Sequence, residues 1–171
     1  MLKAKHVADS LTSHVEILMP SAMNGYDRLF GGQLIMWIDV VAAVAARRHS
    51  GCEVTTASID HLEFKAPAHV NETLYMEGRL TWVGRTSMEV RVDTFVESLG
   101  GERKHVNRAY LIMVALDRDT HKPCPVPGLI LETEEEKAEF AAGALRQQRR
   151  RNGCRSTAYK KPAGSITLSA G

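Results

Sequence analysis

Asp39 is the residue whose surroundings most suggest chemistry. It stands inside the run LIMWIDVVAAVAA, and on a helix its neighbours three and four positions away are Met36, Ile35, Ala42 and Ala43. An isolated carboxylate on such a face is costly, so it must be paired, hydrogen-bonded, protonated or turned toward a cleft. Partial burial of a carboxyl group raises its pKa toward neutrality, which suits a general base. A structural carboxylate bonded across a subunit interface explains the pattern equally well.

A second group of candidates lies just upstream, in the segment NGYDRLFGGQ that begins at Asn24. Gly31, Gly32 and Gln33 precede the apolar run, where the unpaired N–H groups of a first helical turn point outward with the positive end of the helix dipole. That arrangement suits a carbonyl oxygen that gains negative charge. Asn24 could orient a water or a carbonyl. Both features also have ordinary explanations, since Gly-Gly often starts a helix and Asn-Gly often forms a turn.

Motifs for other chemistries are absent from the sequence. It has no G-x-S-x-G nucleophile elbow, no phosphate-binding G-x-x-x-x-G-K-[ST] loop, no G-x-G-x-x-G and no H-E-x-x-H. The seven histidines are scattered without the spacing of metal ligands. Cys52, Cys124 and Cys154 are far apart in sequence and odd in number, which favours reduced structural or surface thiols. We therefore expect no metal and no cofactor.

One buried helix and several long strands must position these residues. The helix is expected from Gln33 to about His49, after the Gly-Gly pair and before Ser50-Gly51. Strands are expected at Ser13–Leu18, Glu53–Glu63, Thr73–Val83, Ser87–Glu97 and Val106–Leu116. The order of these elements predicts an α+β fold in which an antiparallel sheet wraps around a single central helix.

The C-terminal part differs in composition from the rest. A surface helix is expected over 131–145, where ETEEEKAEFAAGAL places acidic residues in the first turn. Residues 146–171 hold seven Lys/Arg and no Asp/Glu, and we expect a basic tail that is disordered or ordered by a partner. The expected domain that carries the site is thus 1–130, with net charge −5 over residues 1–145.

Composition excludes several classes of protein. The chain has 171 residues, of which 44% are hydrophobic and 25% charged, as in globular domains. No apolar run approaches the ~18 residues that span a bilayer, and MLKAKHVADSLT lacks the apolar core of a signal peptide. We expect a cytoplasmic protein without a membrane or nucleic-acid partner, because the body is mildly acidic.

Taken together, the motifs resemble those of the hotdog-fold acyl-CoA thioesterases, the acyl-CoA hydrolase family. The resemblance covers roughly residues 10–130. It is carried by Asn24 with RLFGG at 28–32, IMWID at 35–39, VTTASID at 54–60, FKAP at 64–67, VGRTSM at 83–88, and LD at 116–117 with KP and VP before residue 128. The sequence departs from the family pattern at Asp27, where many members carry glycine.

The resemblance implies a fold, an assembly and a set of site residues. Members pair into dimers that share their active sites and often assemble into hexamers as trimers of dimers. Asn24 and Asp39, from opposite subunits, would be the catalytic pair, and no metal would be needed. Substrate would also contact Gly31, Gly32 and Gln33, and coenzyme A (CoA) would contact Thr55, Thr56, Ala57, Ser58, Arg85, Thr86 and Ser87.

The resulting hypothesis is hydrolysis of an acyl-CoA thioester to a free fatty acid and CoA. Asp39 would take a proton from water, and backbone N–H groups near Gly32 would stabilise the oxyanion. The alternative is a non-catalytic acyl-CoA-binding or regulatory hotdog module. Binding of nucleic acid or membrane through the tail is a weaker case, since only Tyr159 interleaves its cations. A dehydratase would need a histidine near the middle of the helix, whereas His49 lies at its end.

Overall fold

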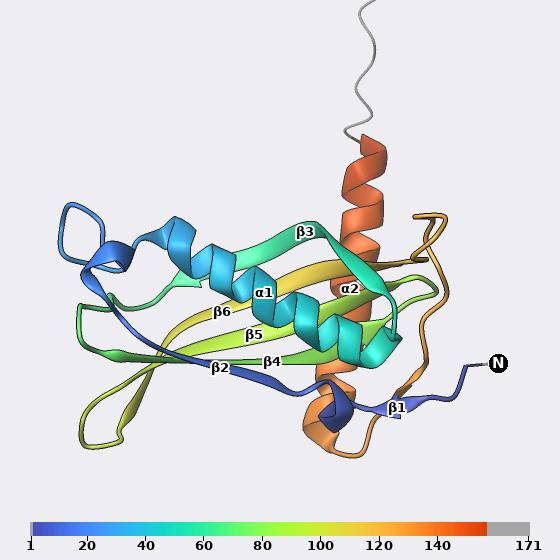
Figure 1. The fold of residues 1–171 in the computed structure, drawn as a ribbon. Helices are drawn as coiled ribbons and strands as arrows, with labels where there is room; N and C mark the ends of the chain where they lie inside the picture. Colours follow the sequence, from blue (N-terminus) through green and yellow to red (C-terminus); the bar gives the residue numbers. More distant parts are fainter. Residues whose placement is uncertain (1, 157–171) are drawn as a thin grey trace, which may run out of the picture.

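A long helix held inside a curled antiparallel sheet is the main feature of the computed structural model, which describes residues 2–156 (Figure 1). The elements, in chain order, are β1 (Lys5–His6), the 3-10 helix η1 (Val7–Ser10), β2 (Thr12–Ile17), the 3-10 helix η2 (Pro20–Ala22), α1 (Gly31–Ser50), β3 (Glu53–Phe64), β4 (Thr73–Val83), β5 (Ser87–Glu97), β6 (Arg103–Leu116), β7 (Leu129–Ile130) and α2 (Glu134–Ser156). The expected α+β fold, with a sheet wrapped around one central helix, is confirmed.

The large sheet has the strand order β2-β4-β5-β6-β3, and all its neighbouring strands are antiparallel. Strand β5 buries both of its faces: Met88, Val90 and Val92 point toward α1, and Glu89, Arg91 and Asp93 of the other face are buried as well. Strands β2 and β3 form the two edges. The small parallel pair β1–β7 was not expected from the sequence.

Helix α1 lies close against the concave face of this sheet. It begins at Gly31, two residues earlier than expected, and ends where Gly51 takes the left-handed conformation (φ +69°). The sheet and the helix approach closely because the residues between them are small. For example, a Cβ added to Gly78 of β4 would lie 2.7 Å from Val41 Cγ1 of α1. On the opposite side, Met36 and Val40 stay about half exposed, at 52% and 54%. Thus α1 has one face in the core and one apolar face uncovered in the single chain.

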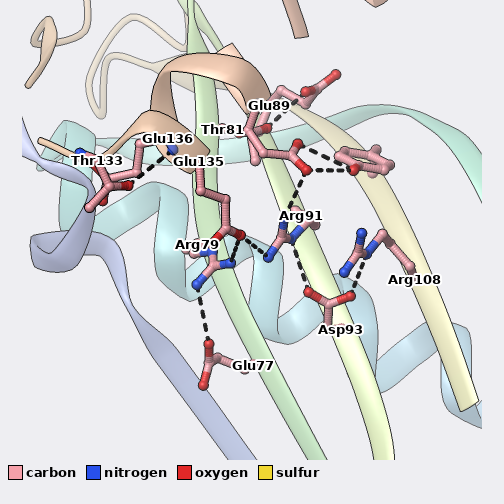
Figure 2. A network of polar contacts seen from close by, with 12 residues as sticks. Glu77, Arg79, Thr81, Glu89, Arg91, Asp93, Arg108, Thr133, Glu135 and Glu136 are labelled. Carbon is pink, nitrogen blue, oxygen red and sulfur yellow. Dashed lines mark hydrogen bonds and ion pairs between the residues drawn. The ribbon is translucent and has the colours of Figure 1, made fainter. Parts of the chain in front are cut away.

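Helix α2 covers part of the outer face of the sheet, opposite α1 (Figure 1). It begins with a capping box, in which the Thr133 hydroxyl accepts from the Glu136 N–H and the Glu136 carboxylate accepts from the Thr133 N–H. Figure 2 shows the polar network beneath it, including Glu89 and Arg91 of β5. Arg91 forms an ion pair of 2.8 Å with Glu139 of α2. The outward-facing side of β5 is therefore buried under α2.

The predicted C-terminal end of this helix, at residue 145, is wrong. Helix α2 does not stop at residue 145 but continues to Ser156. Arg146 donates two hydrogen bonds to the fully buried Glu89, of 2.8 and 3.0 Å, and Arg150 forms an ion pair with Asp60. The basic residues at the start of the expected tail thus find carboxylate partners on the sheet, which composition alone does not reveal.

The remainder of the expected tail, residues 157–171, lies outside the described residues. Within residues 2–156, no helix is long and apolar enough to cross a membrane.

Candidate active site

Asn24 lines a pocket of about 310 Å³ at the N-terminal end of α1. Its side-chain oxygen accepts hydrogen bonds from the N–H groups of Tyr26 (2.9 Å) and Arg28 (3.3 Å), and so holds the loop before the helix. No hydrogen bond of its side-chain amide nitrogen occurs among the described residues. Asn24 therefore fixes the loop with its oxygen and can offer N–H donors to the pocket. The loop also contains Asp27, the departure from the family pattern, in the left-handed region at φ +55°.

The first turn of α1 presents unpaired backbone donors, as the sequence indicated. Leu34 is the first residue of the helix whose N–H finds a backbone acceptor, the carbonyl of Phe30 at 3.1 Å. For Gly31, Gly32 and Gln33 no such partner occurs in the described part of the chain. A Cβ on Gly32 would lie 2.6 Å from the exposed Phe30 ring, so a side chain there would require this ring to move. Three N–H groups at the positive end of α1 are available to an electron-rich oxygen.

Asp39 is half-buried in the middle of α1 and is held by one strong donor. The Thr56 hydroxyl of β3 donates a hydrogen bond of 2.5 Å to its Oδ1 atom, and the same hydroxyl lies 3.4 Å from Met113 Sδ. The carboxylate lies between Met36 and Val40 in sequence, on the uncovered part of the helix. A carboxylate oriented by a hydroxyl next to an open face can accept a proton from a bound water.

A single chain does not bring Asn24 and Asp39 together. Along α1, the pocket around Asn24 extends only to Leu34. Asp39 lies five residues further, which places it about 7.5 Å along the helix axis and about 140° around it. The two expected catalytic side chains therefore occupy different parts of the molecule.

The expected CoA contacts are also spread over the chain. On the edge strand β3, the register shifts between Thr56 and Ser58, so Thr56 bonds to the helix whereas Ser58 donates to Asp60 at 3.3 Å. Thr55 and Ala57 are exposed on the same strand.

The segment from Arg85 through Thr86 to Ser87 belongs to the tight turn between β4 and β5, which is closed by a 2.7 Å hydrogen bond from the Gly84 N–H to the Ser87 carbonyl. Ser87 pairs with Val114 of β6, whereas Val106 lines the Asn24 pocket. Val106 and Val114 are eight positions apart on β6, which corresponds to about 26 Å along the strand. Within one chain this turn is thus remote from Asn24.

The pocket also contains residues that the sequence analysis did not single out as site residues. Phe64 at the end of β3, and Lys65 and Pro67 just after it, line the pocket together with Arg28. Their FKAP motif was noticed only as a sign of resemblance. Arg28 and Lys65 are two cations beside the pocket, and they suit an anionic ligand. In the sequence, the FKAP motif together with the RLFGG loop was the signal that could have identified this pocket.

Comparisons with known proteins agree with this geometry. The model of the thioesterase superfamily matches residues 26–101. An uncharacterised acyl-CoA thioester hydrolase of Bacillus subtilis, YkhA, is 39% identical over 136 residues, which cover 79% of this chain and 78% of YkhA. A solved apo-hexameric acyl-CoA thioesterase is 37% identical with a TM-score of 0.85, over 92% of this chain and 99% of that one.

A third relative bears on individual residues. The acyl-CoA hydrolase of Staphylococcus aureus, solved with butyryl-CoA, CoA and CoA disulfide, is 30% identical with a TM-score of 0.84, over 90% of this chain and 94% of that one. Its solved alanine variants replace an asparagine, an aspartate and a threonine. The intervals between these three positions equal those between Asn24, Asp39 and Thr56. By similarity over most of both chains, this protein belongs to the acyl-CoA thioester hydrolases of the thioesterase superfamily.

Proposed function

We propose that this protein hydrolyses acyl-CoA thioesters to free fatty acids and CoA, at sites shared by two subunits, with Asp39 as the general base. The observation that carries the proposal is the 2.5 Å hydrogen bond from Thr56 to Asp39 beside the uncovered face of α1. It orients a carboxylate without neutralising it, and leaves one oxygen for water.

The uncovered surfaces favour a symmetric dimer. Strand β3 is an unpaired edge, and the neighbouring side of α1 exposes Met36 and Val40. If two β3 edges pair antiparallel about a twofold axis, the Phe64 end of one lies opposite the Glu53 end of the other. The partner's Asn24 pocket, which contains Phe64, then approaches Thr56 and Asp39. A dimer thereby brings together groups that one chain keeps apart.

In this arrangement each group has a defined role. Asp39 takes a proton from water, which attacks the thioester carbonyl. The amide of the partner subunit's Asn24 and the N–H groups at the start of the partner's helix α1 donate to the carbonyl oxygen as it gains negative charge. The tetrahedral intermediate then collapses, the C–S bond breaks, and the proton passes to the departing CoA sulfur. The steps use water and the chain's own groups, with no metal or covalent nucleophile.

The cations of the pocket suggest how CoA is held. Arg28 and Lys65 could neutralise phosphate groups, while Thr55 and Ser58 on the exposed edge could contact the pantetheine arm. Arg85 would reach CoA only from the other end of the sheet. One relative is hexameric, and we extend the proposal to a hexamer built from three such dimers. Because acyl-CoA is a polar metabolite, a cytoplasmic location fits this role.

The decisive test is thiol release from acetyl- to palmitoyl-CoA by the wild type, Asp39→Ala and Asp119→Ala. Loss of a general base costs about 10²–10⁴-fold in turnover, whereas the turn carboxylate of Asp119 serves as a matched control. Turnover by Asp39→Ala within threefold of the wild type, with an intact fold, would refute the proposed base. If no substrate is hydrolysed but acyl-CoA raises the melting temperature, the protein is a binding module.

A further inference from the structure

Two cysteines that are 72 positions apart in the sequence lie side by side in the fold. The Sγ atoms of Cys52 and Cys124 are 3.1 Å apart, and both thiols are free. Both side chains are half-buried against the hydrophobic core. Their distance in the sequence favoured two separate thiols, so this contact was not predicted.

The backbone on both sides holds this pair in place. The Cys52 N–H donates to the Ser50 hydroxyl (3.2 Å), just after the left-handed Gly51 that ends α1. The Cys124 N–H donates to the Ala115 carbonyl at the end of β6 (3.0 Å). Both Cα positions are therefore set by main-chain contacts. A disulfide bond of 2.03–2.05 Å would require the sulfurs to approach by about 1 Å, which rotation of side chains can supply.

The two thiols differ in access and reactivity. Cys52 lines a surface hollow of about 510 Å³, flanked by Arg47 and Arg118, and Cys124 is not among the described residues that line it. Burial, and then the contact with Cys52, raise the pKa of the Cys124 thiol to about 11. Since the thiolate is the nucleophile, Cys124 is a poor first attacker. A small molecule in the hollow meets Cys52 first.

We propose that Cys52 and Cys124 form a redox modification site, which a small-molecule disulfide of the glutathione type converts reversibly into an intramolecular disulfide. The Cys52 thiolate attacks the reagent, forms a mixed disulfide and releases one thiol. Cys124 then loses its proton, attacks the Cys52 sulfur and releases the second thiol. The pair gives up two electrons, and one reagent disulfide becomes two thiols.

The bond would tie the start of β3 to the segment that follows β6. It closes a loop of the chain that contains β3, β4, β5 and β6, so it restricts the unfolded chain strongly. We expect the oxidised protein to unfold about 5–10 °C higher than the reduced protein. The inference is independent of the hydrolytic activity.

The test uses the full chain in a Cys154→Ser background, which leaves only the two cysteines of the pair. The folded protein is incubated with glutathione disulfide, quenched, alkylated and weighed intact, beside a non-reducing gel and a melting curve. The expected result is loss of both alkylation sites in a monomeric band, a higher melting temperature, and reversal by dithiothreitol.

Single substitutions separate the two steps. Cys124→Ser should retain one glutathione on Cys52, whereas Cys52→Ser should leave Cys124 unmodified. The proposal fails if both thiols remain free in the folded parent protein, or if each carries glutathione without closing. It also fails if the bond forms only in urea, or only between chains.

Discussion

Two inactive variants should restore each other's activity when they assemble together, if each active site takes Asn24 from one subunit and Asp39 from the other, as we propose. In Asn24→Ala every site lacks the amide, and in Asp39→Ala every site lacks the base. In a mixed dimer, one site unites both wild-type residues and the other has neither. Co-expression should therefore produce an active site that is absent from both parents.

The size of the recovery follows from the assembly. With equal amounts of both variants and random pairing, half of the dimers are mixed and each has one intact site of two, so activity should reach about a quarter of the wild type. Each parent should retain at most about 1%, since groups of this kind contribute at least 10²-fold. The recovered activity thus stands well above the background.

The assay is thiol release from acyl-CoA by co-expressed variants carrying different affinity tags. The quarter applies to the unfractionated mixture, and mixed dimers purified through both tags should reach about half of the wild-type activity, since one site of two is intact. A matched control pairs Asp39→Ala with Asp39→Asn, for which no intact site can form. Activity no greater than the sum of the parents, in confirmed mixed dimers, would show that both residues act within one chain. A change of the loop that carries Asn24 would then have to bring its side chain to Asp39, which lies about 7.5 Å along α1 and about 140° around it from Leu34 of the Asn24 pocket.

Three further outcomes test the fold that supports the site. Gly78→Ala should lower the free energy of unfolding by about 1–3 kcal/mol in urea titrations, because its Cβ would meet Val41 Cγ1 at 2.7 Å; Gly25→Ala, with nothing within 4 Å, should be nearly neutral. Glu89→Gln should cost about 2–3 kcal/mol and loosen α2 toward proteolysis, since it removes the buried charge with which Arg146 of α2 forms its 2.8 Å ion pair. Burial lowers the pKa of His49 below its ordinary 6.5, so the unfolded chain binds more protons and stability should fall as pH drops below about 6.5. Urea midpoints at pH 7.5 and 5.5 measure this loss, and a smaller difference in His49→Gln than in the wild type is expected; an equal difference would contradict the assignment.

The part of the fold that local sequence determines was predictable. The apolar run between Gly31-Gly32 and Ser50-Gly51 defines α1 to within two residues, because caps and side-chain periodicity act over a few positions. Strand β5 shows its two faces in its alternation for the same reason. Asp39 could be identified as unusual because its neighbours along one helix are apolar.

The contacts that decide chemistry and stability join residues that are distant in sequence. The hydroxyl that orients Asp39 comes from Thr56, and its direction depends on the register shift in β3. The length of α2 depends on Glu89, a carboxylate of β5 buried beneath it, which binds Arg146 from more than fifty positions away in the sequence.

Only the tertiary structure shows which groups meet and which stay apart. It places Cys52 against Cys124, although their spacing in the sequence suggests no relation. It also leaves Asn24 and Asp39 apart on one chain, with the apolar side of α1 uncovered beside an unpaired strand. The sequence by itself determined the elements and the candidate residues, because short-range patterns encode them. Their mutual distances were decided by packing and strand register, which depend on the whole chain at once.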